Sequence, residues 1–266
     1  MGKEDSLFYS TNPTVLILFL FIAMLIVLKL GSLLGDKLRK LSGKKSDSID
    51  TTIVGAVLAL FGFLLGFAFS MGGGRFESRR INNITEANAI STAISRADLY
   101  PPQERQSLRN DFKEYTLARI SYFQVGNNQM EMQTANKKAQ DYAARIWSRA
   151  SCAAVKANSL FPSGLMIPAL NAMMDSANSN NYGEKLKVPD PIIFLLLGIS
   201  LVCAFFVGYY TVNKDWFNRT MTLGFCVLSC MVIYTTLDLD SSRTGFIKHH
   251  TSLQSLTDLL EQFDRP

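Results

Sequence analysis

The chain has 266 residues, and 27 Lys and Arg against 22 Asp and Glu give it a formal net charge of +5. Only 18% of the residues are charged and 48% are hydrophobic, whereas about a quarter of a soluble domain is charged. This composition excludes a disordered chain, a collagen-like fibre and a basic nucleic-acid-binding arm, and it disfavours a purely soluble protein.

Four apolar stretches predict helices that cross a membrane. Residues 51–74 and 191–213 contain no Asp, Glu, Lys, Arg or His, and at about 1.5 Å per residue each can cross a hydrocarbon core of about 30 Å. Residues 15–34 predict a first span that is retained rather than cleaved as a signal peptide, because no clearly basic segment precedes it and no cleavage pattern follows. Residues 220–237 predict the fourth span.

The second span, residues 51–74, carries small residues on one helix face, because they recur at multiples of three and four. These residues are Gly55, Gly62, Gly66 and Gly73. Packing against another helix is the simpler interpretation, since Gly62 and Gly66 form a GxxxG pair. The sharper hypothesis is that the glycines pack neighbours while Phe63, Phe67 and Ser70 form the constriction of a pore.

Residues 75–190 are polar, with fifteen Lys and Arg and eleven Asp and Glu. The segment is too long for a loop and shows no period-two alternation, so it predicts a helical domain outside the membrane. No Gly or Pro interrupts residues 75–100, so the first helix is expected to continue from the second span and to end at Pro101. Further helices are predicted over residues 103–129, 136–159 and 163–177, the last interrupted by Pro168.

Polar residues of the helix that follows the second span share one seam, because they recur at spacings of four and three. The seam contains Arg75, Arg79, Asn82, Glu86 and Arg96. A hydrated helix surface is one interpretation. In an oligomer built around an axis, the same seam predicts a hydrophilic vestibule where the arginines attract anions and Glu86 tunes or repels them.

The patterns of common catalytic and metal sites are missing from the sequence. Its only histidines are the adjacent His249 and His250, its four cysteines lack zinc or disulfide spacing, and it has no phosphate-binding or nucleophile-elbow glycine motif. Asp238 and Asp240 resemble the start of a calcium loop, but the glycine and glutamate that such a loop needs are missing. We therefore expect no enzyme, no cofactor, no metal site and no nucleic-acid partner.

Several motifs together resemble the bacterial bestrophin-like family, also described as domain of unknown function 4239. They include Gly62-Phe-Leu-Leu-Gly-Phe-Ala-Phe-Ser70, Arg75-Phe-Glu-Ser-Arg-Arg80, Glu86-Ala-Asn-Ala-Ile90 and Gly245-Phe246. Further matching residues are Asn88, Asp98, Tyr115, Arg119, Asn171, Asp175, Asp238 and Asp240. One departure follows Asp175, where the family commonly has an arginine and this chain has Asn178, Asn180 and Asn181.

The resemblance implies a pentameric anion channel in a bacterial inner membrane, with the lipid bilayer and permeating small ions as its partners. It also implies a pore neck on the second span and a cytoplasmic helical domain. The charge distribution favours the other side for that domain. The segments at residues 36–50 and 212–219 carry seven Lys and Arg and the two termini carry four, so the positive-inside rule favours an extracytoplasmic domain.

These observations predict an all-α polytopic membrane protein with four transmembrane helices and a helical extramembrane domain between spans two and three. We divide it into residues 1–50 (first span and basic loop), 51–74 (candidate pore helix), 75–190 (helical domain), 191–237 (third and fourth spans) and 238–266 (amphipathic tail). The expected function is an oligomeric, anion-conducting ion channel whose second span and helical extension line the path. The alternative is a non-conducting membrane scaffold or sensor whose helical domain binds a protein partner.

Overall fold

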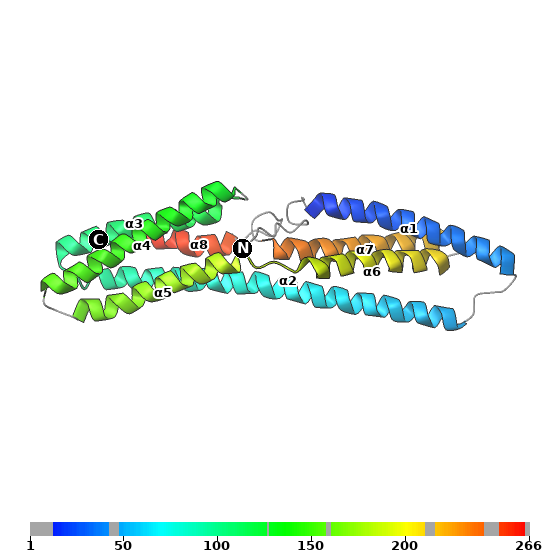
Figure 1. Ribbon diagram of the computed structural model, residues 1–266, viewed down its shortest axis with the longest axis horizontal. Helices are drawn as coiled ribbons and strands as arrows, with labels where there is room; N and C mark the ends of the chain where they lie inside the picture. Colours follow the sequence, from blue (N-terminus) through cyan, green and yellow to red (C-terminus); the bar gives the residue numbers. More distant parts are fainter. Residues whose placement is uncertain are drawn as a thin grey trace. The chain divides into compact units, whose positions relative to one another are not determined.

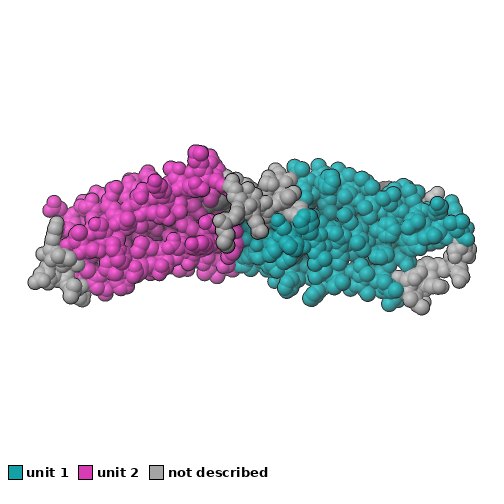
Figure 2. Space-filling model, in the orientation of Figure 1, with its two compact units in different colours: residues 1–75, 187–241 teal, residues 76–186, 242–266 magenta. Residues whose placement is uncertain are grey.

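A computed structural model describes residues 13–42, 48–126, 128–157, 161–210, 216–241 and 250–263. Regular structure in these ranges is helical, with no strand, which confirms the predicted all-α fold class. The chain divides into two compact units (Figure 2). The first consists of residues 1–75 and 187–241, and the second of residues 76–186 and 242–266.

The first unit contains four helices that are long and apolar enough to cross a membrane (Figure 1). They are α1 (Pro13–Ser42), the N-terminal part of α2 (Ser48–Ala97), α6 (Asp190–Tyr210) and α7 (Trp216–Asp240). Their inward faces share an apolar core that includes Met24, Phe61, Cys203 and Ile233, one residue from each helix. The four predicted spans are confirmed, and the chain is an integral membrane protein.

Glycines bring the backbones of α1 and α6 into contact. A Cβ atom built on Gly31 would collide with the carbonyl oxygen of Phe205, and one built on Gly208 would collide with that of Leu28. A Cβ on Gly35 would lie 2.5 Å from a carbonyl oxygen of α6. Gly31 and Gly35 thus form the GxxxG pair of the closest helix contact, and it lies in the first span rather than the second.

The second unit is a helical bundle around its own apolar core. It contains the C-terminal part of α2, α3 (Pro102–Gln124), α4 (Gln129–Ala157), α5 (Phe161–Gly183), α8 (His250–Asp258) and the 3₁₀ turn η1 (Leu259–Gln262). Ile90, Phe112 and Met173 are fully buried in this core. Leu256 and Leu259 join it from the C-terminal tail, so the amphipathic stripe packs against the helical domain.

Several helix boundaries of the second unit differ from the predictions, and so does the effect of Pro168. α3 ends at Gln124, five residues before the expected end, and α4 begins at Gln129, seven residues before its expected start. Pro168 lies inside α5 and does not end it. A proline removes one helical hydrogen bond, but the buried Met166 and Leu170 on either side hold this part of α5 in the core.

Candidate functional site

The exposed face of α2 in the first unit carries the candidate pore residues. Phe63 is 68% exposed and Phe67 is 61% exposed, and Ser70 is exposed one turn further along. Nothing lies within 4 Å of a Cβ atom built on any of the predicted packing glycines, which are Gly55, Gly62, Gly66 and Gly73. Among the described residues of one chain, this face therefore packs against no other helix.

The opposite face of α2 anchors the helix in the first unit. Phe61, Leu65 and Ala68 are buried, and the ring of Phe61 meets that of Phe225 edge to face with centroids 6.1 Å apart. Gly72 also packs on this side, since a Cβ there would lie 3.1 Å from a carbonyl oxygen of α7. The sequence patterns did not single out Gly72, because its closeness depends on α7.

Asp240 joins three segments where the second and fourth spans end. Its carboxylate accepts the Val188 backbone N–H at 2.8 Å and lies 3.5 Å from the guanidinium of Arg75. Asp238 is also buried, with 3% exposure. Asp240 thus stabilises the entry to α6 and engages Arg75, which the sequence placed in a vestibule.

From residue 76 onward the polar seam of α2 belongs to the second unit, and part of it is buried there. Arg79 is 2% exposed and Glu86 is 0% exposed, Asn82 is half-buried, and Arg96 donates to the carbonyl oxygen of Leu165. Because Arg79 and Glu86 are buried, these two residues neither form a hydrated surface nor line an open vestibule. The physical reason is that Ile90 and Ala93 lie on the same face and carry it into the apolar core.

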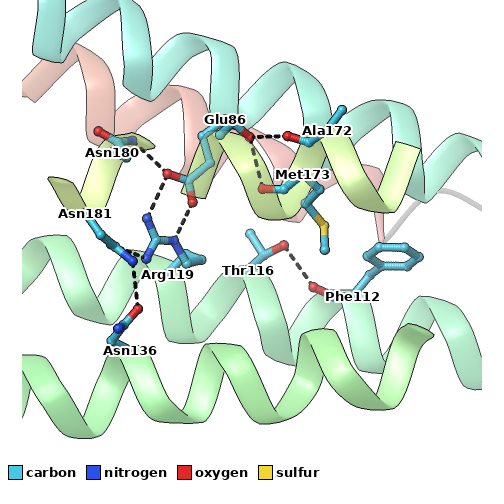
Figure 3. A network of polar contacts seen from close by, with 10 residues as sticks. Glu86, Phe112, Thr116, Arg119, Asn136, Ala172, Met173, Asn180 and Asn181 are labelled. Atoms are coloured by element: carbon cyan, nitrogen blue, oxygen red, sulfur yellow. Dashed lines mark hydrogen bonds and ion pairs between the residues drawn. The ribbon is translucent and has the colours of Figure 1, made fainter. Parts of the chain in front are cut away.

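Glu86 is the centre of a buried polar network (Figure 3). Its two carboxylate oxygens accept from Nε and Nη2 of Arg119, the latter at 2.8 Å, and Asn180 donates to the same carboxylate at 2.7 Å. Arg119 also donates to Asn181 at 3.0 Å, and Asn181 donates to Asn136 at 3.0 Å. The network connects α2, α3, α4 and α5 inside the second unit.

Burial and charge act in opposite directions on Arg119. Burial alone would lower the pKa of its guanidinium, but the adjacent Glu86 carboxylate and its hydrogen bonds raise the pKa above its ordinary value. The guanidinium also lies 4.9 Å from the ring centre of Tyr122 and 5.1 Å from that of Phe123, a cation–π geometry. Arg119 is therefore held as a cation in an apolar setting.

Tyr115 lies one helical turn before Arg119 and is buried. Burial raises the pKa of its phenol, and the Glu86 carboxylate raises it further. Tyr115 therefore stays neutral in the folded chain and adds no charge to the network.

The other residues that carry the resemblance are not brought together. Asp98 pairs with Arg109 at 3.0 Å, and Asn88, Asn171 and Asp175 are exposed on α2 and α5. Asn180 and Asn181 were missed as network members. The available signal for them was their place shortly after Asp175, where the bestrophin-like family commonly has an arginine and this chain has asparagines.

In the part of the chain that the structure describes, no group of three His, Cys, Asp or Glu side chains lies where it could hold a metal ion. His249 and Gly245-Phe246 lie outside the described residues. Of the acidic pair in the tail, Asp240 engages Arg75 and the Val188 backbone N–H.

No known family model matches the sequence, and no curated protein matches it. Solved structures do share its fold. A bacterial bestrophin homologue from Klebsiella pneumoniae with a tryptophan replaced by alanine matches with a TM-score of 0.74 and 10% identity, over 95% of this chain and 97% of its own. A variant of that homologue with a tyrosine replaced by alanine gives 0.71 and 11%, over 92% and 99%. The chain thus has the fold of bacterial bestrophin homologues over nearly its whole length.

Proposed function

We propose that the protein is a homo-oligomeric membrane ion channel in which the exposed face of α2 lines the path. The observation that carries this proposal is the open apolar face with Phe63 and Phe67 on a helix that otherwise packs inside its unit. Because no described residue of the chain packs on that face, α2 is suited to surround an axis together with its copies, where aromatic side chains narrow a pore.

The fold and the sequence resemblance support the same assignment. The structural neighbours are bestrophin homologues, and the motifs of α2 resemble those of the bestrophin-like family. That resemblance implies a pentamer, a neck on the second span and a function that is not enzymatic. All three belong to this proposal.

Anion conduction, which the resemblance also implies, has less support from the side chains. The sequence argument for anions depended on Arg75 and Arg79, but Arg75 is paired with Asp240 and Arg79 is buried in the second unit. Arg79→Glu is therefore a poor test of selectivity, because a buried charge reversal disturbs folding first.

Ion flux through liposomes that contain the purified protein tests the channel directly. Wild-type protein should collapse an imposed potassium chloride gradient, and Phe67→Ala should increase the flux severalfold, because it removes a ring from the narrow part of the path. Phe19→Ala is the matched control, since Phe19 of α1 is 72% exposed but lies on another helix. Vesicles that stay ion-tight at high protein density would refute conduction.

A non-conducting scaffold or sensor is the second candidate, and one observation favours it. The charged residues of the α2 seam make internal contacts such as the Glu86–Arg119 pair, as a helical domain built only for stability and partner binding would have. Under this function wild-type protein and Phe67→Ala would both leave vesicle flux at the background of empty liposomes.

Loop charge and family resemblance predict opposite sides of the membrane for the second unit. The loop charges favour the extracytoplasmic side, whereas the bestrophin resemblance implies the cytoplasm. Cys152 is an exposed native thiol of this unit, and the other three cysteines are buried. A membrane-impermeant maleimide that labels Cys152 in intact cells supports the first side, and labelling only after permeabilisation supports the second. The Cys152→Ser variant gives the background.

A further inference from the structure

Two arginines on α4 share one buried carboxylate of α3, and we propose that they form a binding site for a phosphate group. Asp111 is 6% exposed and lies on α3, which packs against α4 (Figure 1). One of its oxygens accepts from Nε of Arg149 at 2.6 Å, and the other lies 3.6 Å from Nη1 of Arg145. This inference concerns the second unit alone and does not depend on the proposed channel.

The guanidinium of Arg145 is held in place by two neighbours. Besides its ion pair with Asp111, it lies 4.9 Å from the ring centre of Tyr142, and the hydroxyl of Tyr142 donates to Glu114 of α3 at 3.4 Å. Guanidinium groups stack on aromatic faces and present their N–H groups at the edges. Because Asp111 orients both arginines before a ligand arrives, binding costs less side-chain ordering than it would at two freely moving arginines.

Both arginines keep hydrogen-bond donors for a further acceptor. The contacts with Asp111 involve Nε of Arg149 and Nη1 of Arg145, and each guanidinium has five N–H groups. The side chain of Arg145 is 55% exposed and that of Arg149 is 47% exposed. The two residues lie one helical turn apart, where side chains are neighbours. One tetrahedral oxyanion can therefore accept hydrogen bonds from both.

A phosphate monoester matches these donors better than chloride does. It carries a charge of about −1.5 to −2 at pH 7 and three strong acceptor oxygens, and guanidinium groups bind such oxygens through paired hydrogen bonds. The exposed Asp141, one turn before Arg145, and Glu114 weaken the long-range attraction of an anion. Paired hydrogen bonds, rather than the local potential, therefore select the ligand. A soluble phosphate ester and a lipid headgroup that ends in phosphate offer the same chemistry.

Phosphorus NMR of the full-length protein in detergent tests the site. Wild-type protein should broaden the signal of inorganic phosphate saturably at constant ionic strength. Arg145→Gln and Arg149→Gln should each weaken binding about tenfold, because each removes one charged partner. Arg149→Lys keeps a charge beside Asp111 but loses the paired geometry, so it should weaken binding about threefold or more.

Two further variants change a charge on α4 without removing either arginine. Asp141→Asn should strengthen phosphate binding, because a nearby negative charge is lost. Lys137→Gln is the matched control: it removes an exposed cation of the same helix about 18 Å from Arg149 along the axis, and it should bind phosphate as wild type does.

Competition with inorganic phosphate identifies the source of the group. Phosphatidic acid that displaces it at a lower concentration than glycerol phosphate assigns the site to a headgroup, and the reverse order assigns it to a soluble ester; both results support the site. A wild type that binds no phosphate overturns the inference, as does a folded Arg149→Lys that binds as tightly as wild type. Circular dichroism establishes that each variant is folded, and Arg149→Lys decides the matter if the Gln variants are not.

Discussion

Glu86 and Arg119 form a buried ion pair, with side-chain exposures of 0% and 1%. Removing one member leaves the other as an unpaired buried charge, which typically costs about 3–5 kcal/mol. We therefore expect Arg119→Met to lower the thermal unfolding midpoint of the detergent-solubilised protein by roughly 10 °C, as followed by circular dichroism.

The exposed pair of Glu77 and Arg80 provides the control. Arg80→Gln should change stability by about 0–1 kcal/mol, because both charges stay hydrated. Replacing both buried partners, as in Glu86→Leu with Arg119→Met, should recover part of the loss. If Arg119→Met proved as stable as Arg80→Gln, the buried network would not hold the second unit together.

Alkaline pH should weaken the second unit through Tyr115. Burial raises its pKa above the ordinary value of 10.0, so the unfolded chain releases this proton before the folded chain does. The stabilisation is complete below pH 10 and is lost as the pH rises above it. The unfolding midpoint should therefore fall less between pH 8 and pH 11 in Tyr115→Phe than in wild type. Tyr182→Phe, which alters a 69% exposed side chain, should behave as wild type.

At the scale of single residues, the sequence indicated which side chains share a face but not where that face points. Arg79 and Glu86, which the spacing predicts on one seam of the helix, are both buried. Ala87, Ile90 and Ala93 lie close to the same seam, and these apolar neighbours were the available signal that it faces a core. The partners of Glu86 were beyond reach, because Arg119 and Asn180 come from other helices and no local pattern links them.

Close helix packing in the first unit depends on where small residues meet another backbone. Gly208→Val should disrupt the contact of α6 with α1, because even a Cβ there collides with the carbonyl oxygen of Leu28. Overpacking of this kind costs about 1–3 kcal/mol or more, so the unfolding midpoint should fall. Gly198→Val is the matched control on the same helix, with nothing within 4 Å of its Cβ. Equal midpoints for the two variants would contradict the close α1–α6 contact.

At the scale of helices, the sequence was sufficient to predict the extent of a helix where hydropathy or helix-breaking residues determine it. The continuation of α2 to Ala97 followed from the absence of Gly and Pro over residues 75–100. Pro168 was misjudged, because tertiary packing holds a helix through a proline that local rules would use to interrupt it. The glycine pattern of the second span was a true helix face, but the closest contacts use Gly31 and Gly208. A GxxxG pair alone does not tell which partner it meets.

For the whole molecule, the four spans and the helical domain could be predicted because lipid selects long apolar helices regardless of their contacts. Self-association could not be predicted in this way. Lipid tails are as apolar as a neighbouring helix, so an exposed apolar face has the same sequence whether lipid or another copy covers it. Phe19 and Phe67 illustrate the problem, since both are exposed phenylalanines of membrane-spanning helices.

These two phenylalanines also make the proposed assembly testable. If the exposed face of α2 surrounds an axis, residues at position 67 of neighbouring copies come close together, whereas those on the exposed face of α1 lie toward lipid. In a Cys152→Ser background, Phe67→Cys should give disulfide-linked dimers on mild oxidation in membranes, and Phe19→Cys should remain monomeric on a non-reducing gel. Cross-linking that is absent from Phe67→Cys, or as strong in Phe19→Cys, would argue against α2 as the central helix. A sulfur–sulfur bond needs Cβ atoms about 4 Å apart, so a positive result reports direct contact between α2 helices.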